Sequence, residues 1–268
     1  MKRTVLVLVL GTLSGCHMTS GSGDDYPVGG GGGGTVLGGG GGGGGGTGDG
    51  GLIDGTTGDA GTLINGRVCL LTDLRRVGDA TACATTGASG LTVSLGTRTA
   101  LTGTDGSFAI IAPAGNGLVW RVIGDAQHPL TESVMGFGTD PTIPALTDIT
   151  YINLLNQNAA VVNEQQGSVV VRVLSNGAPV TKVTATSSPA TAGVALYDGN
   201  DSVIWNDGVS GTGARGMVWF PGVPLGNAPP TTATIALTLT GTTPPVTTSV
   251  PDVLVEDQAI TFVTQDLQ

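Results

Sequence analysis

The nine residues Thr102-Gly103-Thr104-Asp105-Gly106-Ser107-Phe108-Ala109-Ile110 contain a tight turn followed at once by an extended segment. The dipeptide Asp105-Gly106 accepts positive φ, as the turn of a β-hairpin requires. Phe108 and Ile110 then alternate with Ala109, which places both large apolar side chains on one face of a strand. The stretch therefore predicts a hairpin with one buried face.

The same period of two recurs along the rest of the chain. It is seen in the sets Leu91/Val93/Leu95, Leu118/Trp120/Val122, Val169/Val171/Val173, Ile235/Leu237/Leu239 and Ile260/Phe262. Further turn dipeptides separate these runs, namely Asn176-Gly177, Asp198-Gly199 and Asp207-Gly208. Short alternating strands with regular turns predict an all-β protein of the β-sandwich type. Trp120 and Trp219 lie within such strands, and we expect both in cores.

The pattern occurs twice. Thr212-Gly213-Ala214-Arg215-Gly216-Met217-Val218-Trp219-Phe220 repeats the opening stretch. Before it, Gly167-Ser168-Val169 matches Gly66-Arg67-Val68, and after it Pro224-Leu225-Gly226 matches Pro113-Ala114-Gly115. We therefore predict two tandem modules, over residues 62–150 and 165–268, joined by a linker or short helix at 151–164.

This order of strands and turns resembles the carboxypeptidase regulatory-like and transthyretin-like (prealbumin-like) modules. Residues 104–108 carry the resemblance best, whereas Arg215 replaces the aspartate in the second module, which also has an insertion around residues 194–208. The resemblance implies Ig-like or prealbumin-like β-sandwiches without catalytic residues or cofactors of their own. Such folds are grouped with starch-binding-like sandwiches, so the resemblance also implies a carbohydrate-binding-like fold.

The N-terminus has the layout of an export signal. Met1-Lys2-Arg3 is basic, a short apolar run follows, and Leu13-Ser14-Gly15-Cys16 ends the segment. The last four residues resemble the lipobox of bacterial lipoproteins, which implies a signal peptide over residues 1–15 and lipid, including palmitate, on Cys16. His17 stands where aspartate would favour the inner membrane, so we expect the outer membrane, on its periplasmic or surface face. An ordinary secretory signal with a chance cysteine remains the alternative.

Residues 16–61 are predicted to be a flexible tether. They include unbroken glycine runs at 29–34 and 38–46. Glycine loses more backbone entropy on ordering than any other residue and has no side chain to bury. We therefore expect a disordered, low-complexity linker; a polyglycine helix or hairpin-like structure is the alternative.

The charge of the chain limits its partners. There are 20 acidic and 10 basic residues, for a net charge of −10, and removal of Lys2 and Arg3 with the signal makes this −12. Binding to nucleic acid or to anionic lipid through phosphates requires clustered Lys and Arg. We therefore expect no nucleic-acid partner, and contact with the membrane through the lipid anchor alone.

Cys69 and Cys83 remain as a pair once Cys16 is assigned to lipid. In an oxidising compartment two such cysteines are expected to form a disulfide. The bond would close a loop of about 15 residues and stabilise the fold by about 3 kcal/mol in the loop-entropy model. Two separate buried thiols are the alternative.

Few residues suggest catalysis or metal binding. His128, before Pro129, is expected in an exposed turn, and one folded histidine with two bridged cysteines cannot form a usual zinc site. The dinucleotide-like match at 211–216 is flanked by predicted strands instead of a strand and a helix. Four residues gather in the insertion and read either as polar turn residues or as calcium ligands: Asp198, Asn200, Asp201 and Asp207.

These features predict a non-enzymatic lipoprotein of the cell envelope with no metal or cofactor. It would display its β-sandwich modules on a tether and engage an envelope protein or glycan. The alternative is a carbohydrate-binding surface lipoprotein. That function would require Tyr197 and Trp205 to lie exposed together, since aromatic rings bind sugars by stacking.

Overall fold

The computed structural model describes residues 61–84, 86, 88–199, 205–206, 211–226, 231–240, 242 and 244–267, which all belong to one compact unit. The predicted signal peptide, Cys16 and nearly all of the glycine-rich tether lie outside these residues. The described part contains seventeen strands and a single α-helix, besides two 3-10 turns. The predicted all-β class is therefore confirmed.

The first module consists of two facing sheets. In one, β1 (Leu63–Leu70) pairs antiparallel with β4 (Ser107–Ile111) and parallel with β8 (Thr142–Thr147). The edge beyond β8 is extended by β6 (Leu130–Thr131). The other sheet has the order β3-β2-β5-β7. Its strands are β2 (Thr92–Leu95), β3 (Arg98–Leu101), β5 (Val119–Ile123) and β7 (Ser133–Gly136).

The second module repeats this arrangement. Its β9 (Gln166–Ser175) pairs antiparallel with β14 (Met217–Pro224) and parallel with β17 (Ile260–Asp266). The facing sheet has the order β11-β15-β16, formed by β11 (Val183–Ser188), β15 (Thr232–Leu239) and β16 (Val246–Leu254). Short strands at the margins are β10 (Ala178–Pro179), β12 (Leu196–Asp198) and β13 (Trp205–Asn206).

Each sandwich encloses a core made by the predicted alternation. In the first module Val93, Leu95 and Trp120 are fully buried, and Phe108 is 6% exposed. In the second, Ile235 and Leu237 line the core together with alternate valines of β9. The predicted burial of Trp120 and Trp219 is confirmed, although Trp219 lies in a different core from the one its strand encloses.

The duplication extends to single hydrogen bonds. Thr102 Oγ1 accepts the N–H of Leu91 at 2.9 Å, and Thr212 Oγ1 accepts the N–H of Val183 at 3.0 Å. Each hydroxyl also donates to a backbone carbonyl earlier in its module. The threonine of each Thr-Gly-x-x-Gly turn thus ties that turn to the strand of the facing sheet.

The turns also show which residues of the two modules are equivalent, and this equivalence differs from the one predicted by matching the sequences. Gly106 and Gly216 end the turns with φ of +82° and +67°. Their following strands place Ser107 opposite Arg67 and Met217 opposite Arg172. The structure therefore equates Arg67 with Arg172, and the match of Gly66 to Gly167 is wrong by four positions. The reason is that β9 is longer at its start, where it pairs with the first residues of β17.

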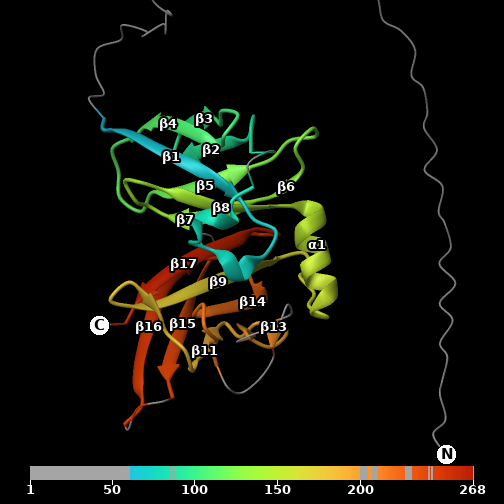
Figure 1. Ribbon diagram of the computed structural model, residues 1–268, viewed down its shortest axis with the longest axis vertical. Coiled ribbons are helices and arrows are strands. Elements are labelled where there is room, and N and C mark those ends of the chain that lie inside the picture. Colours follow the sequence, from blue (N-terminus) through green and yellow to red (C-terminus); the bar gives the residue numbers. More distant parts are fainter. Residues whose placement is uncertain are drawn as a thin grey trace, which may run out of the picture. The chain divides into compact units, whose positions relative to one another are not determined.

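One strand joins the modules. β17 pairs parallel with β9 of its own module over Ile260–Asp266, and its first three residues pair parallel with β7 of the first module. Figure 1 shows β17 running between β7 and β9. The result is a ten-stranded sheet with the path β13-β12-β14-β9-β17-β7-β5-β2-β3, to which β10 is added beside β9.

A third core covers the outer face of the second module's sheet. It is lined by Trp219 and Ile260 from that sheet, Leu74 from the loop after β1, and Tyr151 from the helix α1 (Asp148–Gln157). Thr147 caps the start of this helix, because its side chain accepts the N–H of Thr150. The helix overlaps the segment that the sequence predicted to be a linker or short helix. The third core therefore packs elements of both modules together.

Candidate functional site

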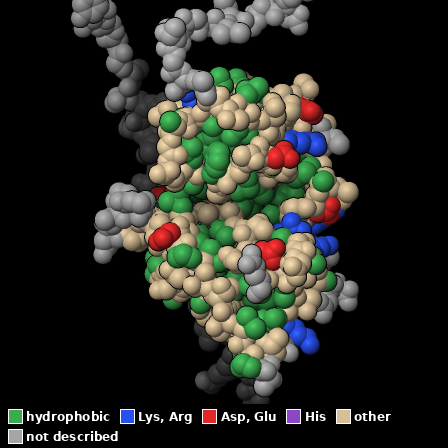
Figure 2. All heavy atoms as spheres, turned by 90° about the vertical axis from the view of Figure 1, so that its left-hand side faces the viewer, with side chains coloured by type: hydrophobic (Ala, Val, Ile, Leu, Met, Phe, Trp, Pro, Cys, Tyr) green, Lys and Arg blue, Asp and Glu red, His purple; other side chains and the backbone are tan. Residues whose placement is uncertain are grey.

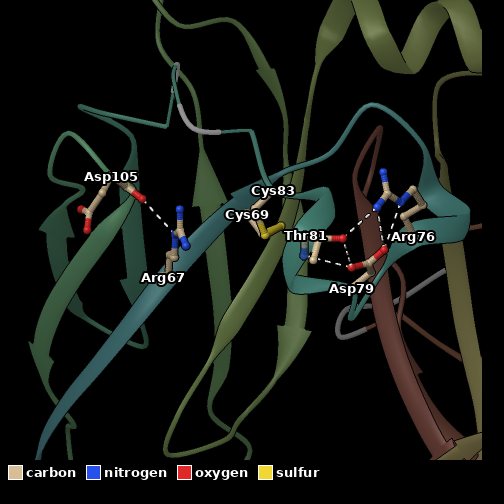
Figure 3. The surroundings of a disulfide bond; sticks show 7 residues. All are labelled: Arg67, Cys69, Arg76, Asp79, Thr81, Cys83 and Asp105. Carbon is tan, nitrogen blue, oxygen red and sulfur yellow. Dashed lines mark hydrogen bonds and ion pairs between the residues drawn. A yellow bond between two sulfur atoms is a disulfide. The ribbon is translucent and has the colours of Figure 1, made fainter.

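A disulfide bond joins Cys69 on β1 to Cys83, with Cα atoms 4.7 Å apart and the sulfur atoms 1.97 Å apart (Figure 3). The loop that it closes contains two 3-10 turns, Leu74–Arg76 and Ala80–Ala82. Asp79 caps the second turn and pairs with Arg76 at 2.7 Å. Hydrogen bonds from Thr81 and Arg76 lower the pKa of Asp79 to about 2.

The disulfide loop packs against the second module. Leu74 is fully buried in the third core. Asp73 pairs with Arg75 at 2.7 Å and lies 3.7 Å from Arg215 of the second module. Burial raises the pKa of Asp73, but the hydrogen bonds and charge of Arg75, together with the charge of Arg215, outweigh it and lower the pKa. The loop therefore connects the modules by apolar packing and by charge.

Tyr197 and Trp205 are not available to stack on a sugar. Tyr197 is 7% exposed, and its hydroxyl accepts the N–H of Ala185 at 3.0 Å and donates to the carbonyl of the same residue. Trp205 is 4% exposed and packs on Trp219 with ring centroids 5.5 Å apart. Both belong to strands added to the edge of the sheet, β12 and β13, so the exposed pair that the carbohydrate-binding alternative requires is not present.

A buried polar network lies inside the third core. Ser168, fully buried on β9, shares a hydrogen bond of 2.6 Å with the hydroxyl of Tyr151 and accepts the indole N–H of Trp219 at 3.2 Å. Burial raises the pKa of Tyr151 to about 12, so its phenol stays protonated. The three side chains satisfy one another and fix the helix against the sheet.

A charged group lies where β5, the segment before β7 and the loop before β17 meet. Arg121 Nε donates to Glu256 at 3.1 Å, its Nη2 also contacts Glu256, and Glu132 lies 3.7 Å away. Burial and the nearby charge of Glu256 raise the pKa of Glu132, against the opposing effect of Arg121. One guanidinium from the first module thus holds carboxylates from both.

The raised pKa of Glu132 predicts a dependence of stability on pH. As the pH falls from neutral toward 4.5, the ordinary value for this carboxyl, Glu132 takes up a proton in the folded protein before it does so in the unfolded chain. We therefore expect the wild-type protein to gain stability over Glu132→Gln as the pH falls through the folded pKa, and to lose it as the pH rises. Urea unfolding of both proteins over this pH window measures the difference. The control is Asp140→Asn, an exposed carboxylate outside the group. A wild-type advantage that shrinks on acidification would contradict the expectation.

Asp198 lies in a strand, whereas the sequence predicted it in a turn. It lies in β12, is 1% exposed, and its carboxylate accepts backbone N–H groups of Gly213, Arg215 and Met217 at 2.7–2.9 Å. Burial raises its pKa, and the three donors act in the opposite direction. Three other members of the acidic cluster lie outside the described residues: Asn200, Asp201 and Asp207. Among the described residues no group of His, Cys, Asp or Glu is arranged to hold a metal.

A groove of about 420 Å³ lies between the modules. Its walls are apolar residues of β7, β16 and β17, with Phe137 46% exposed at the rim and Asp252 as its one ionisable lining residue. Figure 2 faces this side and shows a hollow between the two halves, flanked by hydrophobic side chains. Phe137 stacks on Trp120 with centroids 6.3 Å apart, which fixes the rim to the core of the first module.

His128 is half-exposed, with Nδ1 3.2 Å from Asp125 Oδ1, and the same oxygen accepts the N–H groups of Gln127 and His128. The arrangement is a capped turn, as the sequence predicted. No helix in the described part of the chain is long and apolar enough to cross a membrane.

Taken together, the fold and these contacts define an all-β protein of two β-sandwiches that share one sheet and a third core. Neither the models of known protein families nor the curated proteins match the sequence. Sequence reasoning missed the junction residues Arg121, Glu132, Ser168 and Glu256. The one available signal was Ser168, a polar residue directly before a run of valines.

Proposed function

We propose that the chain is a non-enzymatic lipoprotein of the bacterial cell envelope that displays its folded body to other envelope components. Lipid on Cys16 holds it to the outer membrane, and residues 17–61 separate the anchor from the body. The proposal rests on the basic tip, apolar run and Leu13-Ser14-Gly15-Cys16 of the N-terminus.

The structural observation that carries the display role is the pairing of β17 with both modules. Modules joined only by a flexible linker would each present a separate surface. Here the shared sheet, the third core and the Arg121–Glu256 pair hold residues of both modules in one body. Such a body can present a surface that spans both modules, including the groove beside Phe137.

We assign the two modules to the carboxypeptidase regulatory-like or transthyretin-like sandwiches. The assignment is supported by the repeated arrangement of one central strand between an antiparallel and a parallel neighbour. It is also supported by the Thr-Gly-x-x-Gly turn in both halves. The carbohydrate-binding alternative loses its basis at Tyr197 and Trp205, because both are buried.

The anchor is tested by Cys16→Ser in the full-length chain. We expect the variant to move from the membrane fraction to the soluble fraction and to lose incorporation of labelled palmitate, because the thiol is the acceptor of the lipid. His17→Ala is the matched control, since it leaves the thiol in place and should remain in membranes. Retention of Cys16→Ser in the membrane pellet, or wild-type protein without palmitate, would refute the anchor.

A further inference from the structure

Corresponding edge strands of the two modules differ in whether another strand pairs with them. In the second module the outer edge of β14 is covered by β12, whose Leu196 and Tyr197 lie opposite Trp219 and Val218. The equivalent strand of the first module is β4, and within the described residues no strand pairs with its outer edge. The duplication therefore provides an internal comparison: the same edge is covered in one half and open in the other.

Part of the β4 backbone points away from β1, toward an edge with which no described strand pairs. The N–H of Ala112 donates to Thr62 and that of Val68 donates to Gly106, each at 2.9 Å, so alternate residues of β4 bond toward β1. By this alternation Ala109 and Ile111 direct their N–H and C=O groups away from β1. Their side chains are exposed as well.

The edge of β4 also lacks the usual protection. Natural edge strands carry charges, prolines or bulges that prevent pairing with another chain. The β16 edge has these features, with Pro251 and a register shift opposite β15. The sequence of β4 has neither charge nor proline. Beside it, the cross-strand neighbours Leu63 and Ile111 are 59% and 43% exposed.

We propose that the β4 edge pairs with β4 of a second copy of this chain, antiparallel about a two-fold axis. An antiparallel strand pair is self-complementary, and in this one Ala109 of one copy can lie opposite Ile111 of the other, a small residue facing a large one. β4 contains no charged residue, and β3, at the same end of the module (Figure 1), contains one, Arg98. The acidic residues behind the net charge of −10 therefore lie outside these two edge strands.

The two-fold axis also brings the β3 edges together. Within the described residues β3 is the edge strand of the facing sheet, and its Leu101 is 69% exposed. Because both sheets of the sandwich end here, one axis perpendicular to the layers relates both pairs of edge strands. The dimer would thus bring Leu101 and Ile111 of each copy to one interface.

The test uses the mature chain with Cys16→Ser, so that association is measured without the lipid and independently of the proposed anchor. Sedimentation velocity across a wide concentration range is expected to show a reversible dimer. Hydrogen exchange is expected to slow at the Ala109 and Ile111 amides as the concentration rises. Ala109→Pro, which removes an outward N–H, and Ile111→Lys, which places like charges together, should both give monomers.

Ile123→Lys is the matched control, because Ile123 is exposed to a similar extent, 41%, but lies outside both edge strands. It should remain a dimer. Circular dichroism and thermal unfolding check that each variant is folded. A chain that is monomeric at every concentration, or a dimer that survives both Ala109→Pro and Ile111→Lys, would overturn the proposal. Association only with a strand of another protein would do the same.

Discussion

Replacing Asp198 with alanine is expected to lower the free energy of unfolding by about 4 kcal/mol, because three backbone N–H groups lose their acceptor in a buried site. Oδ1 accepts from Gly213 at 2.9 Å and Met217 at 2.8 Å, and Oδ2 accepts from Arg215 at 2.7 Å. Part of the full penalty is relieved where water can reach the turn. Urea unfolding followed by tryptophan fluorescence measures the change.

Asp105→Ala is the matched control for Asp198→Ala. Asp105 lies in the first module's turn at 102–106, which corresponds to the turn at 212–216 that Asp198 binds. There Asp105 is exposed and accepts the N–H and hydroxyl of Ser107. Water can replace those bonds, so Asp105→Ala should lower the free energy of unfolding much less than Asp198→Ala does. Asp198→Asn should fall between the two, since it keeps one acceptor and turns a donor toward Arg215. Equal losses for Asp198→Ala and Asp105→Ala would contradict the structural role of Asp198.

Trp219→Ala is expected to destabilise the protein by a similar amount, about 4 kcal/mol, as large-to-small changes of buried tryptophan do. Trp219 is fully buried, its ring packs against Trp205 and Tyr151, and its indole N–H donates to Ser168 at 3.2 Å. The cavity would open in the third core, between the modules. Chemical unfolding at equilibrium measures the loss.

Two further variants separate packing from hydrogen bonding at Trp219. Trp219→Phe keeps most of the ring but removes the indole N–H that donates to Ser168. Because Ser168 keeps its hydrogen bond with Tyr151, we expect the free energy of unfolding to fall by only about 1–2 kcal/mol. Phe137→Ala removes a ring that is 46% exposed and should cost less than Trp219→Ala. If Trp219→Ala were no more destabilising than Phe137→Ala, the third core would not hold the modules as described.

The strands could be predicted from the sequence because the information is local. Alternation at Val93 and Leu95 or at Ile235 and Leu237 decides which face is buried, and the structure buries those side chains. The duplicated turn could also be predicted, because the Thr-Gly-x-x-Gly pattern recurs at Thr102 and Thr212 within five consecutive residues each time. Each of these features depends on residues close together along the chain.

The junction could not be predicted because it depends on pairing between distant residues. Arg121 and Glu256 are 135 positions apart, and no local pattern indicates that β17 would pair with β7. The burial of Tyr197 and Trp205 was missed for a related reason. Their segments are short and lack alternation, and they become strands only by adding to the edge formed by β14.

The position of β17 has a consequence for the order in which the protein can be completed. The strand that covers the β7 edge of the first module follows all the other described strands along the chain. Until β17 emerges, the β7 edge of the first module is uncovered and one edge of β9 lacks its parallel neighbour. The first module is therefore completed only after β17 has been synthesised, and a chain that stops before β17 would lack the strand that both modules share.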